Sequence, residues 1–170
     1  MRFWNLITAL MVLIAIIGAS TPSLAESETF SSFFTPLEQC KVITREKMEM
    51  HYFKEKCPGK EGYNVYVEGG DDRSWLVLTK GALEIKRFEP PIYFENISGK
   101  VLEWRYRTVG GKKTLMALIY RVTVNRPDEP DKFRSFLYVI RLEPKKSCVL
   151  GDVSSNDEAH KLADSDQQCP

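Results

Sequence analysis

Side chains alternate between apolar and polar along most of the chain after residue 40, and this period of two constrains the fold more than any other feature. From Val101 to Arg107, for example, Leu102, Trp104 and Tyr106 fall on one face of an extended strand. Turn residues separate such runs, and the predicted strands are Val42–Tyr52 (one strand or two), Tyr63–Glu68, Trp75–Thr79, Leu83–Phe88, Ile92–Phe94, Val101–Arg107, Thr114–Val124 and Phe133–Leu142. About eight short strands predict a mainly β fold, either a single antiparallel β-sandwich or an open barrel.

Two segments depart from simple alternation. The strand Thr114–Val124 is apolar on both faces in its middle, which is typical of a central strand covered on both sides. Near the carboxyl terminus, Ser155 and Glu158 fit a capping box, and Ala159, Leu162 and Ala163 follow at helical spacing. We therefore expect one short C-terminal helix. The acidic connection Asn125–Lys132, with two prolines, is expected to be an exposed hairpin loop.

The first 25 residues have the three parts of a secretory signal peptide. Arg2 is the only charged residue, Leu6–Ile17 is an apolar stretch, and Ser23-Leu24-Ala25 matches a signal-peptidase site. The apolar stretch is shorter than the roughly 20 residues that span a bilayer, so no stable membrane span is expected after cleavage. The alternative is an uncleaved N-terminal anchor. Glu26 rather than Cys follows the site, which argues against a bacterial lipid anchor.

Four cysteines follow the leader, namely Cys40, Cys57, Cys148 and Cys169. In an oxidising compartment they are expected to form two disulfides, of which three connectivities exist. We favour Cys40 with Cys57 and Cys148 with Cys169, because each pair closes a local loop of roughly 20 residues that could bridge neighbouring elements. By the loop-entropy model each disulfide would add on the order of 3 kcal/mol. A zinc site is disfavoured, since no C-x-x-C pair occurs and both histidines lie far from any cysteine pair in sequence.

The leader is followed by an expected arm at residues 26–39 and a single disulfide-linked β-domain at residues 40–170. The arm is polar and Ser-rich, and its aromatic residues Phe30, Phe33 and Phe34 are expected to tuck against the body. About 145 residues after the leader suffice for one domain with a substantial core. A disulfide from Cys148 to Cys169 would hold the C-terminal helix against the sheet.

The charge balance argues against nucleic acid as a partner. The sequence has 24 Lys and Arg and 23 Asp and Glu, and removal of Arg2 with the leader leaves 23 of each. A general nucleic-acid-binding protein needs an excess of basic residues to displace counterions from phosphates. The net charge of about zero therefore favours other partners.

Catalytic and cofactor motifs are not evident in the sequence. His51 and His160 are the only histidines. His51 falls on the polar face of a predicted strand and His160 on the predicted helix beside Lys161, so both are expected at the surface. No G-x-S-x-G, P-loop or G-x-G-x-x-G motif occurs, so we expect no cofactor and no catalytic residue of a known constellation. Paired cysteines would leave no thiolate nucleophile.

One candidate binding cluster is Asp71-Asp72-Arg73, directly after two glycines. These side chains could bind a cation or orient a sugar hydroxyl. The alternative is a hairpin turn in which Asp supplies side-chain hydrogen bonds and Gly supplies positive φ. An EF-hand loop is excluded because its ligand positions do not continue past Arg73.

A second candidate is the polar face of the predicted core strands. Glu103, Arg105 and Arg107 line one side of a strand, Arg121 lies on the next, and Arg141 joins them if the register allows. Guanidinium groups bind carboxylate or phosphate in bidentate geometry, so this row is a candidate site for an anionic partner. The alternative is a solvated sheet face with cross-strand ion pairs.

Several runs carry a resemblance to known proteins. They are Leu102–Arg107, Ala117–Arg121, Tyr138–Leu142 and the tail from Cys148 to Cys169. In these runs the chain resembles a group of small exported proteobacterial proteins of unknown function, which implies a periplasmic location and assigns no activity. Ser98-Gly99, Trp104, Tyr106 and Gly110–Lys113 also resemble, loosely, the pattern of periplasmic lysozyme inhibitors, which are disulfide-linked β-barrels.

The sequence thus favours a non-enzymatic, periplasmic or secreted domain that binds an envelope protein, a glycan or the envelope itself. Its hairpin loops at 69–73, 110–113 and 125–132 are suited to present contacts. The alternatives are a carboxylate-based envelope hydrolase, with Asp71, Asp72 and Glu103 as candidates, a lysozyme-inhibitor-like protein, and a purely structural role in the envelope.

Overall fold

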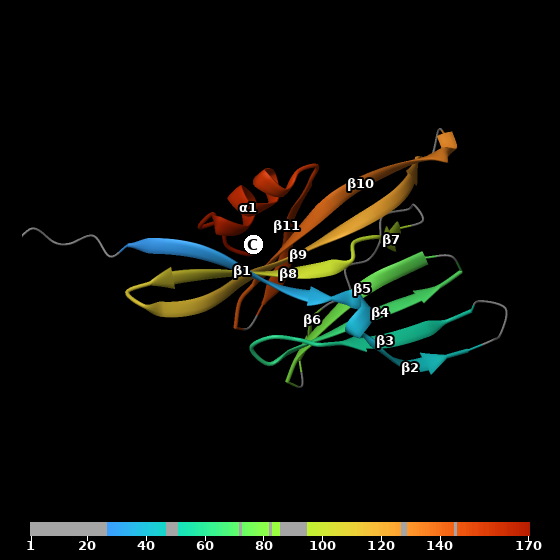
Figure 1. Ribbon diagram of the computed structural model, residues 1–170, viewed down its shortest axis with the longest axis horizontal. Coiled ribbons are helices and arrows are strands. Elements are labelled where there is room, and N and C mark those ends of the chain that lie inside the picture. Colours follow the sequence, from blue (N-terminus) through green and yellow to red (C-terminus); the bar gives the residue numbers. More distant parts are fainter. Residues whose placement is uncertain are drawn as a thin grey trace, which may run out of the picture.

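The computed structural model describes residues 27–46, 51–71, 73–81, 83–85, 95–126, 129–144 and 146–170. Two antiparallel sheets pack face to face, and one helix lies over the outer side of the larger sheet (Figure 1). The elements are β1 (Glu28–Pro36), a 3-10 turn η1 (Leu37–Gln39), β2 (Lys41–Arg45), β3 (Phe53–Cys57), β4 (Tyr63–Gly70), β5 (Arg73–Lys80), β6 (Leu83–Ile85), β7 (Glu95–Ile97), β8 (Val101–Val109), β9 (Lys112–Arg126), β10 (Glu129–Leu142), β11 (Ser147–Val153) and α1 (Asn156–Asp164).

Sheet A, the six-stranded sheet, has the order β1-β8-β9-β10-β11, with β7 paired to β9 at its side. Sheet B, the five-stranded sheet, has the order β2-β3-β4-β5-β6. Every pairing among the described residues is antiparallel. The prediction of an antiparallel sandwich is therefore confirmed, and these strands do not close into a barrel.

The main core lies between the two sheets and follows from the alternation along each strand. Trp104 of β8 is fully buried there, and its Nε1 donates to Thr35 Oγ1 at 3.0 Å. Thr35 is itself buried, and its hydroxyl donates to the Pro58 carbonyl at 3.3 Å. The indole nitrogen, a polar atom that burial would otherwise penalise, is thus satisfied by a contact that also links sheet A to the loop after β3.

A second, smaller core lies on the other face of sheet A, beneath the helix. Ala117 and Ile119 of β9 pack there with Ala159 and Ala163 of α1. The expectation that β9 is covered on both sides is therefore confirmed. The predicted capping box is confirmed as well, because Ser155 Oγ accepts from the Glu158 backbone N–H at 3.3 Å and the Glu158 carboxylate accepts from the Ser155 backbone N–H at 3.1 Å. Within the described ranges, no helix is both long enough and apolar enough to cross a membrane.

The disulfides have the favoured connectivity. Cys40 bonds to Cys57, across the β2–β3 pair, and Cys148 of β11 bonds to Cys169, beyond the end of α1. All four cysteines are paired, which indicates an oxidising location outside the cytoplasm.

Residues 26–39 differ from the expected arm. Most of this segment forms β1, an edge strand that pairs with β8 over its whole length, followed by η1. Phe33 and Phe34 are 45% and 50% exposed rather than tucked against the body, whereas Phe30 is half-buried. The predicted leader, residues 1–25, lies outside the described residues.

Other strand boundaries also differ from those predicted from the sequence. The run Val42–Tyr52 is not one strand, since β2 ends at Arg45 and β3 begins only at Phe53. The predicted loop Asn125–Lys132 is mostly strand, because β9 continues to Arg126 and β10 begins at Glu129. A strand that the pattern did not predict, β11, pairs with β10 and completes sheet A.

The C-terminal tail is attached to sheet A by Arg141 as well as by the disulfide. This side chain is only 2% exposed, and its guanidinium donates to the carbonyl oxygens of Ala163 (3.1 Å), Ser165 (2.6 Å) and Gln167 (3.0 Å). Burial lowers the pKa of Arg141. The three carbonyls compensate for this desolvation, so the tail and the buried cation depend on one another.

Replacing Arg141 therefore tests how the tail is held. We expect Arg141→Met to lower the free energy of unfolding by about 3 kcal/mol, because it leaves the buried Ala163 carbonyl and the part-buried Ser165 and Gln167 carbonyls without this donor. Urea denaturation followed by circular dichroism measures the change. Arg134→Met, at an exposed position of the same strand, is the control, and an equal effect of the two substitutions would contradict this role for Arg141.

Candidate functional site

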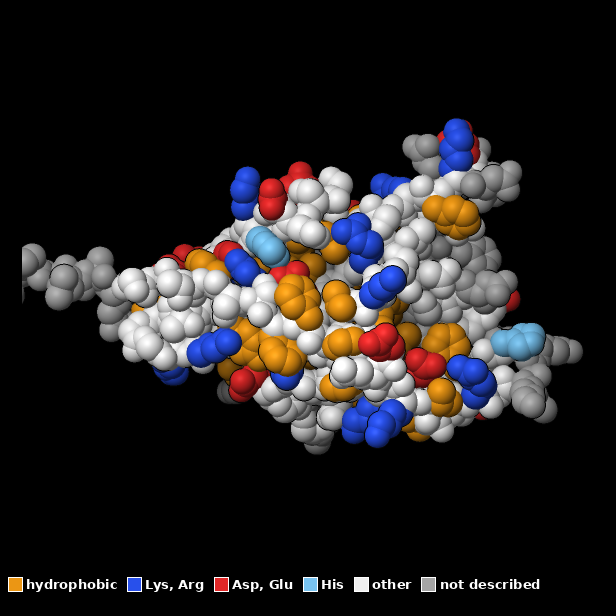
Figure 2. All heavy atoms as spheres, in the orientation of Figure 1, with side chains coloured by type: hydrophobic (Ala, Val, Ile, Leu, Met, Phe, Trp, Pro, Cys, Tyr) orange, Lys and Arg blue, Asp and Glu red, His pale blue; other side chains and the backbone are white. Residues whose placement is uncertain are grey.

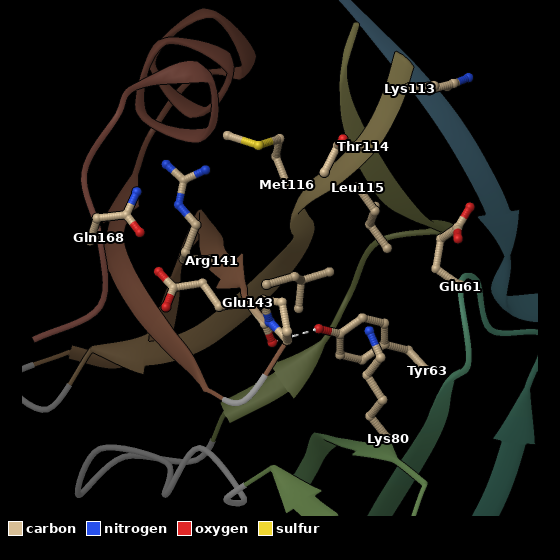
Figure 3. Close-up of a pocket in the computed structure, with 12 residues that line it drawn as sticks. Glu61, Tyr63, Lys80, Lys113, Thr114, Leu115, Met116, Arg141, Glu143 and Gln168 are labelled. Carbon is tan, nitrogen blue, oxygen red and sulfur yellow. Dashed lines mark hydrogen bonds between the residues drawn. The ribbon is translucent and has the colours of Figure 1, made fainter. Parts of the chain in front are cut away.

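A cavity of about 380 Å³ opens at one end of the sandwich, where β4 and β9 begin and β5 and β10 end. Its size is in the range of small binding sites in proteins. The lining residues, most of them labelled in Figure 3, are Glu61, Tyr63, Lys80, Lys113, Thr114, Leu115, Met116, Arg141, Leu142, Glu143, Pro144 and Gln168.

Tyr63 joins the two sheets at this cavity. It is the first residue of β4, and its hydroxyl donates to the Glu143 carbonyl, just after β10, at 3.1 Å. Lys80 is its cross-strand partner at the end of β5, and the ammonium lies 4.2 Å from the centre of the Tyr63 ring. Burial is the main cause that raises the pKa of Tyr63, so the phenol stays protonated and remains a donor at neutral pH.

A second lysine and tyrosine lie on the β8–β9 side. The Lys113 ammonium is 4.4 Å from the centre of the Tyr106 ring, a cation–π contact. Burial raises the pKa of Tyr106, and the nearby Glu61 carboxylate adds to the shift. This side of the cavity therefore presents an ammonium and a carboxylate, with the neutral phenol of Tyr106 in the core beside them.

The two carboxylates of the cavity do not face each other. Glu143 Oε1 accepts from the Cys169 backbone at 3.1 Å, whereas Glu61 lies across the cavity, and in Figure 3 the two carboxylates point in opposite directions. The side chain of Leu115 lies between them (Figure 3), and Leu142 also lines the cavity. Paired acid–base chemistry needs carboxyl groups that converge on one bond, so the arrangement suits binding better than hydrolysis.

The predicted cluster at residues 71–73 lies at the tip of the β4–β5 hairpin, away from this cavity. Asp71 has a φ of 54°, as a tight turn requires, and its carboxylate accepts from Arg73 at 3.1 Å. Both side chains are exposed. Asp72 lies outside the described residues. The local geometry is that of the hairpin turn, with an ion pair at its tip.

The polar face of β8 is the outer face of sheet A, and the C-terminal residues cover it. His160 Nε2 lies 2.8 Å from Glu103 Oε1, and the Arg105 guanidinium makes a bidentate pair with Asp164 at 2.7 and 2.6 Å. The hydrogen bond with Asp164 raises the pKa of Arg105. The anionic partner of this arginine is thus a side chain of the same molecule.

The other predicted arginines of this face also bind groups of the same molecule. Arg107 pairs with Asp166 at 2.7 Å and with Glu28. Arg121 donates to Ser135 Oγ at 3.3 Å, further along the sheet. The register does bring Arg141 into the same row as Arg105, through Ala117, but its guanidinium binds carbonyls of the tail.

The carboxylates considered for hydrolysis lie apart. Asp71 is in a turn of sheet B, whereas Glu103 is on the face of sheet A that is turned away from sheet B. No cluster of three or more potential metal-ligating side chains occurs among the residues that the structure describes.

The cavity residues Tyr63, Lys80 and Glu143 were not predicted from the sequence as site residues. A signal for the first two existed, because Tyr63 and Lys80 stand at the two ends of a predicted hairpin and pair directly in it. Glu143 could not be placed, since its contact with Tyr63 depends on how the two sheets pack.

The chain matches no protein-family model, no curated protein and no solved structure.

The inter-sheet hydrogen bond of Tyr63 can be tested by its pH dependence. We expect Tyr63→Phe to lower the free energy of unfolding by about 1 kcal/mol at neutral pH. Because the pKa of Tyr63 is raised on folding, its stabilising contribution is complete below the ordinary value of 10.0 and is lost as the pH rises through the folded-state value. The difference in unfolding free energy between wild type and Tyr63→Phe should therefore narrow above pH 10.

Chemical denaturation between pH 7 and 11 measures this difference. Tyr66→Phe is the matched control, because that ring contacts Lys54 and Lys56 outside the cavity. If the difference in unfolding free energy between wild type and Tyr63→Phe stayed constant across this pH range, the stabilising role of the Tyr63 hydroxyl would be contradicted.

Proposed function

We propose that the protein is a non-enzymatic binding domain of the bacterial periplasm, or a secreted one, that binds a polypeptide of the cell envelope at the cavity between its sheets. The two disulfides support a compartment where thiols oxidise. The expected leader and the resemblance to exported proteobacterial proteins support the periplasm in particular.

The observation that carries this proposal is the geometry of the cavity. The charged groups around the cavity do not converge on one point (Figure 3), while Leu115 and Leu142 supply apolar lining. Lys80 is held against the Tyr63 ring and Glu143 against the tail backbone, so both are positioned before a ligand arrives. Pre-positioned polar groups beside an apolar lining provide affinity and orientation, which is what binding requires.

The same groups indicate the chemistry of the partner. An apolar side chain would contact Leu115 and Leu142, and a neighbouring acidic group would pair with the Lys80 ammonium. One face of the Tyr63 ring is covered by Lys80, which disfavours the stacking that sugars use on open aromatic rings. A polypeptide with adjacent apolar and acidic side chains therefore fits the cavity better than a glycan does.

Site-specific photo-crosslinking in intact cells tests the proposal. We expect a benzoylphenylalanine at Thr114, a cavity residue, to give an adduct of one defined mass. Lys80→Glu in the same protein should reduce its yield about tenfold, which corresponds to about 1.4 kcal/mol of binding energy.

Two controls separate the cavity from the rest of the surface. The crosslinker at Lys161, an exposed position of α1, should give no such adduct, and Lys161→Glu should leave the Thr114 adduct unchanged. Equal adducts from both positions, or a Thr114 adduct that is insensitive to Lys80→Glu, would refute the cavity as the binding site.

A further inference from the structure

β1 is an atypical edge strand. It is the terminal strand of sheet A, with β8 as its one neighbour there, and it is nine residues long. The other terminal strands described, β11, β2 and β6, have seven, five and three residues. Proteins ordinarily protect edge strands by keeping them short or by placing charged residues and prolines in them. In β1 the single charge, Glu28, and the single proline, Pro36, both stand at its ends.

The side chains of β1 also expose apolar surface. Phe33 and Phe34 are 45% and 50% exposed, and Val101, opposite Pro36 in the register, is 39% exposed. Figure 2 shows hydrophobic side chains along β1 and the turn that follows it. An unprotected strand edge with exposed aromatic residues is typical of a surface that pairs with another strand.

The sequence of β1 is suited to pair with itself. We propose that β1 pairs antiparallel with β1 of a second copy, about a two-fold axis that is perpendicular to sheet A and passes midway between the two Ser32 residues. Such an axis keeps each face of the sheet on its own side, so a residue can oppose only a residue of its own face. The register centred on Ser32 is the one that pairs all nine residues, from Glu28 opposite Pro36 to Ser32 opposite Ser32.

This register places aromatic residues where they can interact. On the outer face Phe30 lies opposite Phe34 of the second copy, and by symmetry the pair occurs twice, on either side of Ser32. Directly opposed aromatic side chains are among the favourable cross-strand pairs. The pairing would cover the exposed Phe34 and would supply partners for the outward backbone groups of β1. Pro36 lacks an N–H, so it costs one hydrogen bond at each end of the ladder.

The elements around β1 are compatible with this pairing. α1 packs over β8, β9, β10 and β11, which leaves the outer face beside β1 accessible. On the inner face, the loop after β3 approaches the carboxyl half of β1, where Pro58 contacts Thr35 and Lys60 lies 3.4 Å from the centre of the Phe33 ring. Because the two strands are antiparallel, the corresponding loop of the second copy lies at the opposite end.

Charge substitutions at the opposed pair test both the interface and its register. Sedimentation equilibrium on the protein with both disulfides formed should show a concentration-dependent dimer. Phe30→Lys combined with Phe34→Lys places like charges opposite each other and should weaken the dimer at least tenfold. Phe30→Lys combined with Phe34→Glu places opposite charges there and should restore association, which should then weaken with added salt.

Thermal unfolding of the two double variants, which differ at one position, verifies that both are folded. A wild-type chain that stays monomeric to millimolar concentration overturns the proposal, even if it binds an added extended peptide. A dimer that survives Phe30→Lys with Phe34→Lys, or one that Phe30→Lys with Phe34→Glu does not restore, overturns the interface or its register. The cavity is untouched by these variants, so the outcome is independent of the proposed function.

Discussion

Sheet A is apolar on both of its faces in the middle of β9, and this double burial determines how the rest of the molecule is arranged. Sheet B covers one face, where its residues Val65, Leu76 and Leu78 share a core with Trp104 of β8, and α1 covers the other through Ala159 and Ala163. A nine-residue helix is too short to be stable alone, so it depends on the sheet for its packing. The capping box, the disulfide from Cys148 to Cys169 and the three bonds from Arg141 all hold the helix and its tail in that position.

Because α1 covers the outer face of sheet A, the polar row on β8 has a structural role. A row of glutamate and arginine residues on an open sheet is a candidate surface for ligands, but beneath a helix it must be neutralised internally. Asp164 forms an ion pair with Arg105, and His160 is hydrogen-bonded to Glu103. The row therefore specifies where α1 docks. The cavity lies elsewhere, at the end of the sandwich, and Tyr63 and Glu143 both line it.

Features of the sequence that act locally were predictable, and those that depend on distant pairing were not. The β4–β5 hairpin, the capping box and both disulfides involve residues close in sequence, and all are confirmed. β1 was mistaken for an arm because Phe33 and Phe34 break its alternation and because its partner, β8, is far along the chain. The cavity and the partners of Arg105 require knowledge of how the two sheets and the tail pack, which no local pattern contains.

Symmetry connects the proposed dimer with the proposed binding cavity. An axis perpendicular to sheet A leaves both copies of sheet B on one side of the joined sheet and both helices on the other. The two cavities, which lie between the sheets, are then on the same side as well. A partner with two copies of its binding segment could occupy both at once, and the second contact would form at the effective concentration set by the dimer rather than by diffusion. An individual cavity with modest affinity would therefore suffice for stable attachment to an envelope protein that is itself repeated or oligomeric.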